Sequence, residues 1–329
     1  MDFASTLRTH PLFSHCSDRI LESLASVVSL QQAEGGTAIL RQQASPAALS
    51  VVLDGEIRIF RLAPRGAIPL RAVRRETLLG DLCYVENCEF FQSSASAAAN
   101  TSLLAFDTPL LRVRAAADDA LEHALHWSLW RSLGLKLRAA DDRLEGLIAS
   151  LVGGDGVSLG LPARGAGESS PRPPRIDPEE KRRFFQQQLL SPLEVEFLAG
   201  LSRERRLAPG QPLFAEGDPA GSMFTVLEGQ VEIHRYIPGA GMETLALLDP
   251  GAYFGELALA DHLPRSANAS GSENGALVLE LPREAAEEAL SSTAAHSLRL
   301  LRLLCSLSVR RLRHTDQQIL DWHLLRGDG

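Results

Sequence analysis

The sequence predicts an α+β protein, mainly β, built from two tandem β-rolls of the jelly-roll type that are each flanked by helices. Three observations lead to this prediction. The length of 329 residues suits about two domains. The chain repeats one pattern at a nearly constant spacing, and each repeat has short apolar runs separated by Pro and Gly turn signals.

The internal repeat is visible in two pairs of segments. Residues 39–55 (ILRQQASPAALSVVLDG) match residues 213–229 (LFAEGDPAGSMFTVLEG) at an offset of 174, which is 229 minus 55. Downstream, residues 78–81 (LLGD) match residues 253–256 (YFGE), and the offset drifts by only one or two positions. One domain is therefore expected to occur twice, head to tail.

The two copies are separated by a segment unsuited to folding. Between residues 153 and 175, six Gly, four Pro and three Ser make up 13 of 23 residues. Such a segment has too little apolar surface to order itself, so we interpret it as a flexible linker. The predicted division is a first domain at 1–152, the linker at 153–175 and a second domain at 176–329.

Within the second copy, the elements are expected in the order helix, strands, long helix. Residues 192–201 place apolar side chains on one helical face. The β-branched and aliphatic residues on both sides of Glu228-Gly229 predict two strands joined by a turn. Turn signals recur at Pro209-Gly210, residues 217–219 and Pro250-Gly251, as in a small antiparallel roll.

Two long helices are predicted at residues 118–151 and from residue 283 to about residue 325. Each has leucine at helical spacing over more length than one small roll can cover. The leucine stripes favour a homodimer formed through these helices or packing between domains, and packing of each helix on its own roll explains them equally well.

Composition excludes several classes of protein. The formal charge is 33 minus 41, or −8, which disfavours a general binder of nucleic acid or anionic membranes. No apolar run is long enough to span a bilayer, and residues 1–10 have no signal-peptide core. We therefore expect a cytoplasmic protein that does not insert into a membrane. The four cysteines have neither disulfide-framework nor metal-site spacing, and no metal site or cofactor is expected.

The run FGELAL at 254–259, followed by PRSA at 264–267, has the residues of a sugar-phosphate site. Gly255 allows a ligand to approach the backbone, and successive amides at a helix start bind anions. Glu256 has two acceptor oxygens for a ribose hydroxyl, and Arg265 has a planar donor fork for a phosphate. An internal ion pair between these two side chains is the alternative interpretation.

This run resembles the phosphate-binding cassette of cyclic-nucleotide-binding domains, as found in catabolite activator protein and in protein kinase A regulatory subunits. The segments EGDPA at 216–220 and MFTVLEGQVEI at 223–233 are similar to the strand-turn-strand signature of the same family. The resemblance implies that Glu256 binds the ribose and Arg265 the phosphate. It implies further contacts from the following residues: Gly255, Leu257, Ala258, Ser266 and Ala267 at the sugar-phosphate, and Ile233, Leu245 and Ala246 at the base.

A second resemblance lies near the end of the chain. The run RRLRHT at 310–315 is similar to the dimerising helix of catabolite activator protein, where a threonine meets the adenine amino group. The resemblance makes Thr315 a candidate for that contact, although Asp316 stands where the family member has a small hydroxyl residue. A helical threonine that merely faces solvent is the alternative.

The first copy departs from the cassette. It has Gly80-Asp81 for Gly255-Glu256, Gln43 for Gly217, and, by alignment, Gln92 for Arg265. A buried phosphate without a cation is strongly disfavoured, so we predict that the first domain binds no cyclic mononucleotide and acts in docking or dimerisation. The basic residues Arg71, Arg74 and Arg75 are alternative sources of the missing charge.

The sequence therefore predicts a non-enzymatic cytoplasmic signal receptor that binds a cyclic nucleotide, with cAMP as first candidate, in the second domain and relays it to an effector protein. A DNA-reading helix-turn-helix is not expected, because the sequence ends directly after the long helix. No common catalytic motif is present. The alternatives are an inhibitory regulatory subunit, a ligand-independent scaffold and a cyclic dinucleotide receptor.

Overall fold

A computed structural model describes residues 2–46, 48–152, 179, 198–237, 241–291 and 295–326. The chain forms two compact units: Met1–Leu147 together with Ser292–Gly329, and Ile148–Ser291. The predicted linker, 153–175, lies outside the described residues. The predicted second domain, 176–329, differs from the second unit, because the C-terminal helix packs within the first unit.

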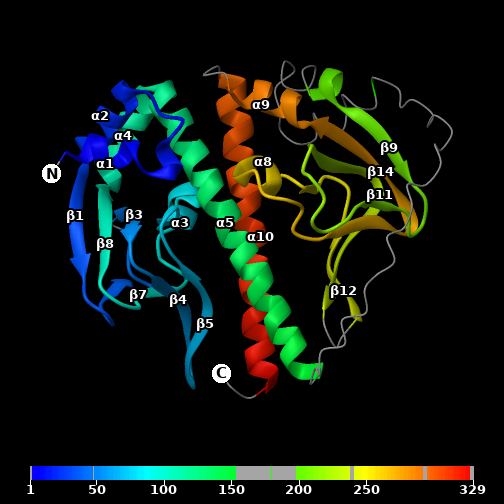
Figure 1. The fold of residues 1–329 in the computed structure, drawn as a ribbon, viewed down its shortest axis with the longest axis horizontal. Helices are drawn as coiled ribbons and strands as arrows, with labels where there is room; N and C mark the ends of the chain where they lie inside the picture. Colours follow the sequence, from blue (N-terminus) through cyan, green and yellow to red (C-terminus); the bar gives the residue numbers. More distant parts are fainter. Residues whose placement is uncertain are drawn as a thin grey trace. The chain divides into compact units, whose positions relative to one another are not determined.

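The first unit contains a β-roll made of two four-stranded antiparallel sheets (Figure 1). One sheet has the order β1 (Val28–Ala33), β8 (Thr101–Asp107), β3 (Ala48–Asp54), β6 (Leu78–Leu79). The other has the order β2 (Ala38–Leu40), β7 (Ser94–Ala97), β4 (Ile57–Ala63), β5 (Gly66–Val73). Short helices precede the roll and link its strands: α1 (Phe3–Arg8), η1 (Pro11–Phe13), α2 (Asp18–Ala25), α3 (Asp81–Glu86) and α4 (Thr108–Ala117).

The second unit repeats this roll with longer strands. Its main path has the order β10 (Pro212–Phe214), β14 (Asn268–Pro282), β11 (Ser222–Ile237), β12 (Gly241–Leu248), while β9 (Arg203–Leu207) pairs with β14 and β13 (Tyr253–Phe254) with β11. Strands β11 and β14 each run through positions that two separate strands occupy in the first roll. The predicted fold class is confirmed, with antiparallel β-rolls flanked by helices in both units.

Strand register confirms the sequence repeat. Ile59 pairs with Ala95 in the first roll, and Ile233 pairs with Ala269 in the second, so both members of the pair are offset by 174. Ile59 also pairs with Arg71, and Ile233 with Ala246, and a register shift follows in each hairpin.

The turn expected at Glu228-Gly229 is instead an irregularity inside the continuous strand β11. The register with β14 shifts on either side of it, between Val226 and Glu228 and between Gly229 and Val231. Gly229 has a φ of 68°, a conformation that glycine adopts without strain. The strand therefore bends at Gly229 without reversing, as at a β-bulge.

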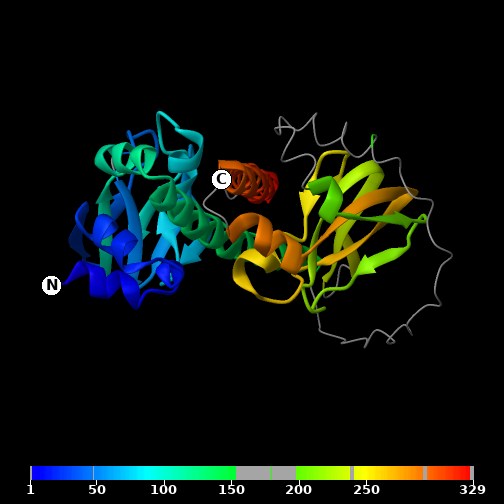
Figure 2. The same cartoon turned by 90° about the horizontal axis from the view of Figure 1, so that it is seen from above.

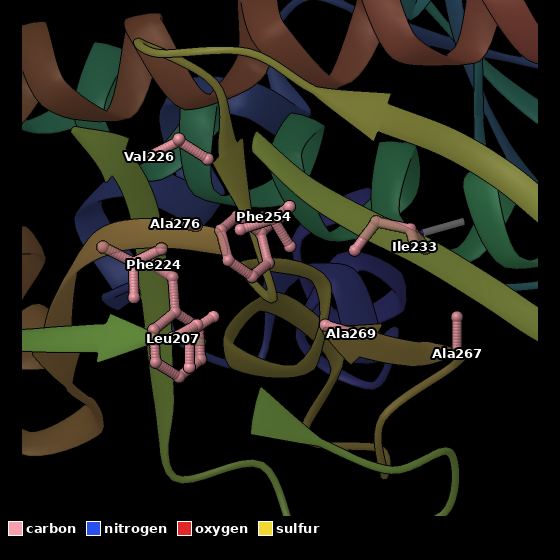
Figure 3. Packing of buried hydrophobic residues seen from close by; sticks show 10 residues of the cluster. Leu207, Phe224, Val226, Ile233, Phe254, Ala267, Ala269 and Ala276 are labelled. Atoms are coloured by element: carbon pink, nitrogen blue, oxygen red, sulfur yellow. The ribbon is translucent and has the colours of Figure 1, made fainter. Parts of the chain in front are cut away.

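The core of the second roll is one apolar cluster drawn from β9, β11, β13 and β14 (Figure 3). The rings of Phe224 and Phe254 stack with centroids 5.2 Å apart, and Phe214 lies against both. The small residues Ala267 and Ala269 keep the strand that follows the cassette close to these rings. The cassette is thus fixed to the core at both of its ends.

The two long helices of the first unit are α5 (Asp119–Val152) and α10 (Ala295–Arg326) (Figure 1). They lie against each other, since Arg302 pairs with Glu122, Arg311 pairs with Asp141 at 3.1 Å, and the Cys305 thiol donates to the His126 carbonyl (Figure 2). Within the described residues, most leucines of the two stripes are buried in the single chain. Burial of the stripes therefore needs no second chain, and the homodimer stays a prediction.

The helix expected over 283–325 is found as two helices. They are α9 (Arg283–Ser291), which buries Leu290 in the second unit, and α10, which packs in the first. The helix expected at 118–151 is confirmed as α5. Of the helix expected at 192–201, only residues 198–201 are described, and they are helical. Across the described residues, no helix combines the length and apolar character needed to cross a bilayer.

His10 makes the first unit sensitive to acid. Its side chain is buried, Nδ1 accepts from the Leu12 amide at 3.3 Å, and Nε2 lies 3.2 Å from the Val52 carbonyl, an arrangement that suits the neutral ring. Burial, with smaller contributions from Arg75 and Arg131, lowers the pKa of His10 from 6.5 to about 4.

Because the unfolded chain binds this proton first, stability is expected to fall as the pH drops below about 6.5, by ~2 kcal/mol near pH 5. Urea unfolding followed by tryptophan fluorescence checks this, because Trp127, Trp130 and Trp322 all belong to the first unit. A His10→Gln variant should show a smaller loss over the same pH range. An equal loss in wild type and variant contradicts the role of His10.

Candidate functional site

The cassette predicted at 254–267 forms one connected loop in the second unit. Strand β13 ends at Phe254, Gly255 adopts a left-handed conformation, and α8 (Leu257–Asp261) follows Glu256 as its N-cap residue. The helix ends at His262, which is also left-handed with a φ of 58°, and the chain returns to β14 through Arg265. Because Leu257 and Ala258 are buried, α8 is held against the roll.

Gly255 is required by both backbone conformation and space. Its φ is 73°, and an added Cβ would lie 2.6 Å from Nη1 of Arg265 and 3.3 Å from a ring carbon of Phe224. The guanidinium of Arg265 thus packs directly on the glycine. The predicted neighbours Gly255 and Arg265 are brought together.

Arg265 is a buried cation, with 6% of its surface exposed. Nη1 donates to the Gly255 carbonyl at 2.9 Å and Nη2 to the Ser222 hydroxyl at 3.4 Å. Its guanidinium carbon lies 4.3 Å from the centroid of the Phe214 ring and 5.4 Å from that of Phe224. Aromatic faces stabilise a guanidinium at these distances, so the side chain is held in place without a carboxylate hydrogen bonded to it in the described contacts.

One donor of Arg265 has no partner. The Nε atom is buried and makes no hydrogen bond within the described part of the chain. Burial lowers the pKa of the Arg265 guanidinium, and the charges of Glu256 and Glu280 oppose that effect. Arginine stays protonated at neutral pH even so. A buried, charged donor without a partner is the kind of group that an anionic ligand satisfies.

Glu256 is buried at the start of α8, with 5% of its surface exposed. Its charge acts on Arg265, which places the two groups of the predicted sugar-phosphate site in one electrostatic neighbourhood. Ser266 is half-buried immediately after Arg265.

The predicted base-contacting residues lie on the adjoining strands. Ile233 of β11 and Ala246 of β12 are register partners, and Leu245 precedes Ala246. Ile233 and Ala267 belong to the apolar cluster (Figure 3). Leu245 and Ala246 pack against it while remaining partly exposed. The site thus has a charged end at Arg265 and Glu256 and an apolar surface beside it.

Thr315 does not join this set within the second unit. It is a buried residue of α10, which belongs to the first unit, and its proposed base contact stays a prediction.

Sequence reasoning missed Arg283, the first residue of α9. Its guanidinium donates to the Ala220 carbonyl at 2.7 Å and to the Ala258 carbonyl of α8 at 2.8 Å, and it lies 2.7 Å from Nδ1 of His262. It also pairs with Glu287 of α9 at 3.3 Å. Arg283 therefore ties α8 to α9. Its partners are mainly backbone carbonyls, which no sequence motif reports.

The alignment of Gln92 with Arg265 is wrong by one residue. In the second roll the Arg265 amide donates to the Asp218 carbonyl, and in the first roll the Phe91 amide donates to the Ala44 carbonyl, again at an offset of 174. Phe91 is buried, whereas Gln92 is exposed. The uneven loop length between Asp81 and Phe91 concealed this correspondence, and it is a phenylalanine that replaces the cation.

The described residues contain no group of three or more His, Cys, Asp or Glu side chains that could hold a metal ion. All four cysteines are free thiols.

Residues 204–293 match the model of the family described as "Cyclic nucleotide-binding domain". This segment is similar to cyclic nucleotide-binding domains. The match includes the whole cassette, Arg283 and the apolar strands β11 and β12, so each member of the predicted site except Thr315 lies inside the matched segment.

Part of the chain is also similar to curated proteins. The chain is 35% identical over 132 residues to a "Cyclic AMP receptor protein" of Thermus thermophilus, covering 40% of this chain and 58% of the relative. It is 30% identical over 112 residues to a "CRP-like cAMP-activated global transcriptional regulator" of Mycobacterium tuberculosis, covering 34% of this chain and 48% of the relative. The chain thus spans about half the length of these curated relatives.

Solved structures are similar at lower identity. The regulatory domain of Toxoplasma gondii PKA with cAMP covers 91% of this chain and 94% of its own, with 16% identity and a TM-score of 0.33. A structure titled "cAMP bound PfPKA-R (141-441)" covers 87% and 82%, with 16% identity and a TM-score of 0.35.

Substituting Gly255 tests the close packing in the cassette. In Gly255→Ala, a left-handed φ at alanine costs about 1 kcal/mol and the new Cβ displaces the Arg265 guanidinium. Affinity for a cyclic nucleotide is expected to fall about tenfold or more, as measured by isothermal titration calorimetry with cAMP as the probe. Gly221→Ala is the matched control, because nothing lies within 4 Å of its added Cβ and its φ is ordinary. Equal affinities in the two variants contradict this interpretation of the cassette.

Proposed function

We propose that the second roll is a receptor site for a cyclic mononucleotide, with cAMP as first candidate, and that the protein is a non-enzymatic signal relay. The observation that carries the proposal is the buried Arg265 guanidinium, whose Nε has no hydrogen-bond partner in the described residues. A cyclic phosphate supplies the anionic acceptor that this group needs. Glu256 supplies acceptors for a ribose hydroxyl, and the apolar residues Ile233, Leu245 and Ala246 suit a base.

Arg283 offers a route from the site to the rest of the chain. A ligand that draws the cassette inward acts on α8, and the hydrogen bond from Arg283 to Ala258 transmits that movement to α9. The ligand shifts the population of two states only as far as it binds one of them more tightly. The state it favours is then presented to an effector protein.

Calorimetric titration of the full chain with cAMP, cGMP and cyclic dinucleotides tests the proposal. We expect cAMP to bind with the highest affinity and a stoichiometry of one per chain, since the first roll has Phe91 in place of the cation. The proposal is refuted if the titrations detect no heat of binding with any of these ligands. Two molecules of cAMP per chain refute the assignment to the second roll alone.

The relatives suggest two kinds of target for the signal, DNA and another protein. One is a cAMP-activated transcriptional regulator, and similar solved structures include kinase regulatory subunits. We propose a protein effector, because the chain carries a net charge of −8. Pull-down with and without cAMP tests this, and retention of DNA in place of a protein contradicts it.

A further inference from the structure

A small cavity in the first roll occupies the position that corresponds to the cassette site of the second. Its volume is about 50 Å³, and its lining includes Gly80, Asp81 and Phe91, the counterparts of Gly255, Glu256 and Arg265. A buried water needs at least ~10–15 Å³ measured in this way, so there is room for only a few waters. The lining also includes Lys136 of α5 and Arg313 and Asp316 of α10.

Asp81, the counterpart of Glu256, already has partners within the chain. Asp81 has no side-chain exposure, and Nζ of Lys136 lies 2.6 Å from its Oδ1. The Ser132 hydroxyl donates to Oδ2 at 3.0 Å. Lys136 and Ser132 both come from α5, and Lys136 also donates to the Leu78 carbonyl. Both oxygens of Asp81 therefore have partners within the chain.

The counterpart of the base surface carries a charge. Arg71 holds the position, opposite Ile59, that Ala246 holds opposite Ile233 in the second roll. The guanidinium is buried and forms an ion pair with Asp316 of α10, whose side chain is 8% exposed. An apolar surface suited to a base is thus replaced by an arginine whose acceptor comes from the C-terminal helix.

Two neighbouring contacts bring α10 to the same place. Arg313 pairs with Glu86 of α3 at 2.6 Å, and the Gln317 side chain accepts from Arg61 of β4 at 3.4 Å. Together with Asp316, these residues cover one turn of α10. The helix therefore contacts the first roll at its cassette and at the hairpin beside it.

We propose that the C-terminal helix is the permanent ligand of the first roll, with the Asp316 carboxylate serving as a built-in anion for Arg71. The correspondence of subsites rests on the function proposed for the second roll. On this view, the first roll takes up α10 in place of a nucleotide and holds it whether or not the second roll is occupied. The test therefore uses no nucleotide.

Unfolding of the full chain followed by tryptophan fluorescence reports the first unit alone, since the three tryptophans, at 127, 130 and 322, lie there. The variants are Arg71→Gln, Asp316→Asn and the double variant. Each single change leaves a buried charge without its partner and is expected to lower the thermal midpoint by about 10 °C. The double variant is expected to lose less than the sum of the two, and additive losses overturn the pairing.

Inorganic phosphate distinguishes a ligand-like carboxylate from a purely structural ion pair. At constant ionic strength, phosphate at about ten times its Kd should raise the midpoint of Asp316→Asn by about 4 °C, because Arg71 is then free to bind an anion. Wild type and the double variant should not respond. An equal response in wild type and Asp316→Asn overturns the proposal. If Asp316→Asn does not fold, we expect the double variant to fold, because it has no unpaired charge. If neither variant folds, the proposal is overturned.

Discussion

Replacing Arg265 by glutamine is expected to weaken cAMP binding by about two to three and a half orders of magnitude. The ligand phosphate would then be buried without a cationic partner, which costs ~3–5 kcal/mol, and each 1.4 kcal/mol is about a factor of ten in Kd. Glutamine keeps a donor but not the charge, and it lacks the guanidinium that lies over the Phe214 ring and donates to the Gly255 carbonyl.

The matched control is Arg206→Gln, which removes an exposed arginine from β9 of the same unit. Calorimetry should give wild-type affinity for this variant. Circular dichroism of both variants checks that the roll is folded, since Arg265 also packs on Phe214 and Phe224. Binding by folded Arg265→Gln within a few-fold of wild type contradicts the proposed phosphate contact.

The second large effect is expected at Lys136. In Lys136→Met, the Asp81 carboxylate stays fully buried while losing its ammonium partner at 2.6 Å, and Ser132 is left as its side-chain donor from α5. Breaking a buried pair from one side costs ~3–5 kcal/mol. Burial lowers the pKa of Lys136, and the charge of Asp81 opposes this effect, so Asp81 favours the charged form of Lys136.

Urea unfolding of the first unit by tryptophan fluorescence measures the loss. The double variant Lys136→Met with Asp81→Asn removes both charges and should recover part of the stability lost in Lys136→Met. If Lys136→Met is as stable as wild type, the buried ion pair between Lys136 and Asp81 is contradicted. The pair is also contradicted if the double variant is less stable than Lys136→Met.

The cassette of the second roll could be predicted because its determinants are local. Gly255 and Arg265 lie ten positions apart, and their contact follows from one short helix and one loop. The repeat was equally accessible, since glycines at 55 and 229 mark the same backbone position with φ values of 94° and 68°. The fold class followed from the length of the chain, its internal repeat and the turn signals between apolar runs.

What the sequence did not disclose depends on contacts between distant residues. Asp316 and Arg71 are 245 positions apart, and a leucine stripe does not specify which surface will cover it. Arg283 donates hydrogen bonds to backbone carbonyls, and because every residue has a backbone carbonyl, no sequence pattern marks these partners. The shift from Gln92 to Phe91 arose because the loop between Asp81 and β7 has one residue more than its counterpart, and only backbone pairing fixes where that residue is placed.

The membership of α10 in the first unit has a consequence for synthesis of the chain. The second unit is inserted within the sequence of the first, between residues 147 and 292. Because domains generally fold as they leave the ribosome, the second unit can complete its roll while the first still lacks a helix. Until residues 295–326 emerge, Glu122 and Asp141 of α5 lack their arginine partners and Arg71 has no Asp316. The part of the protein translated first is therefore the last to reach its native packing.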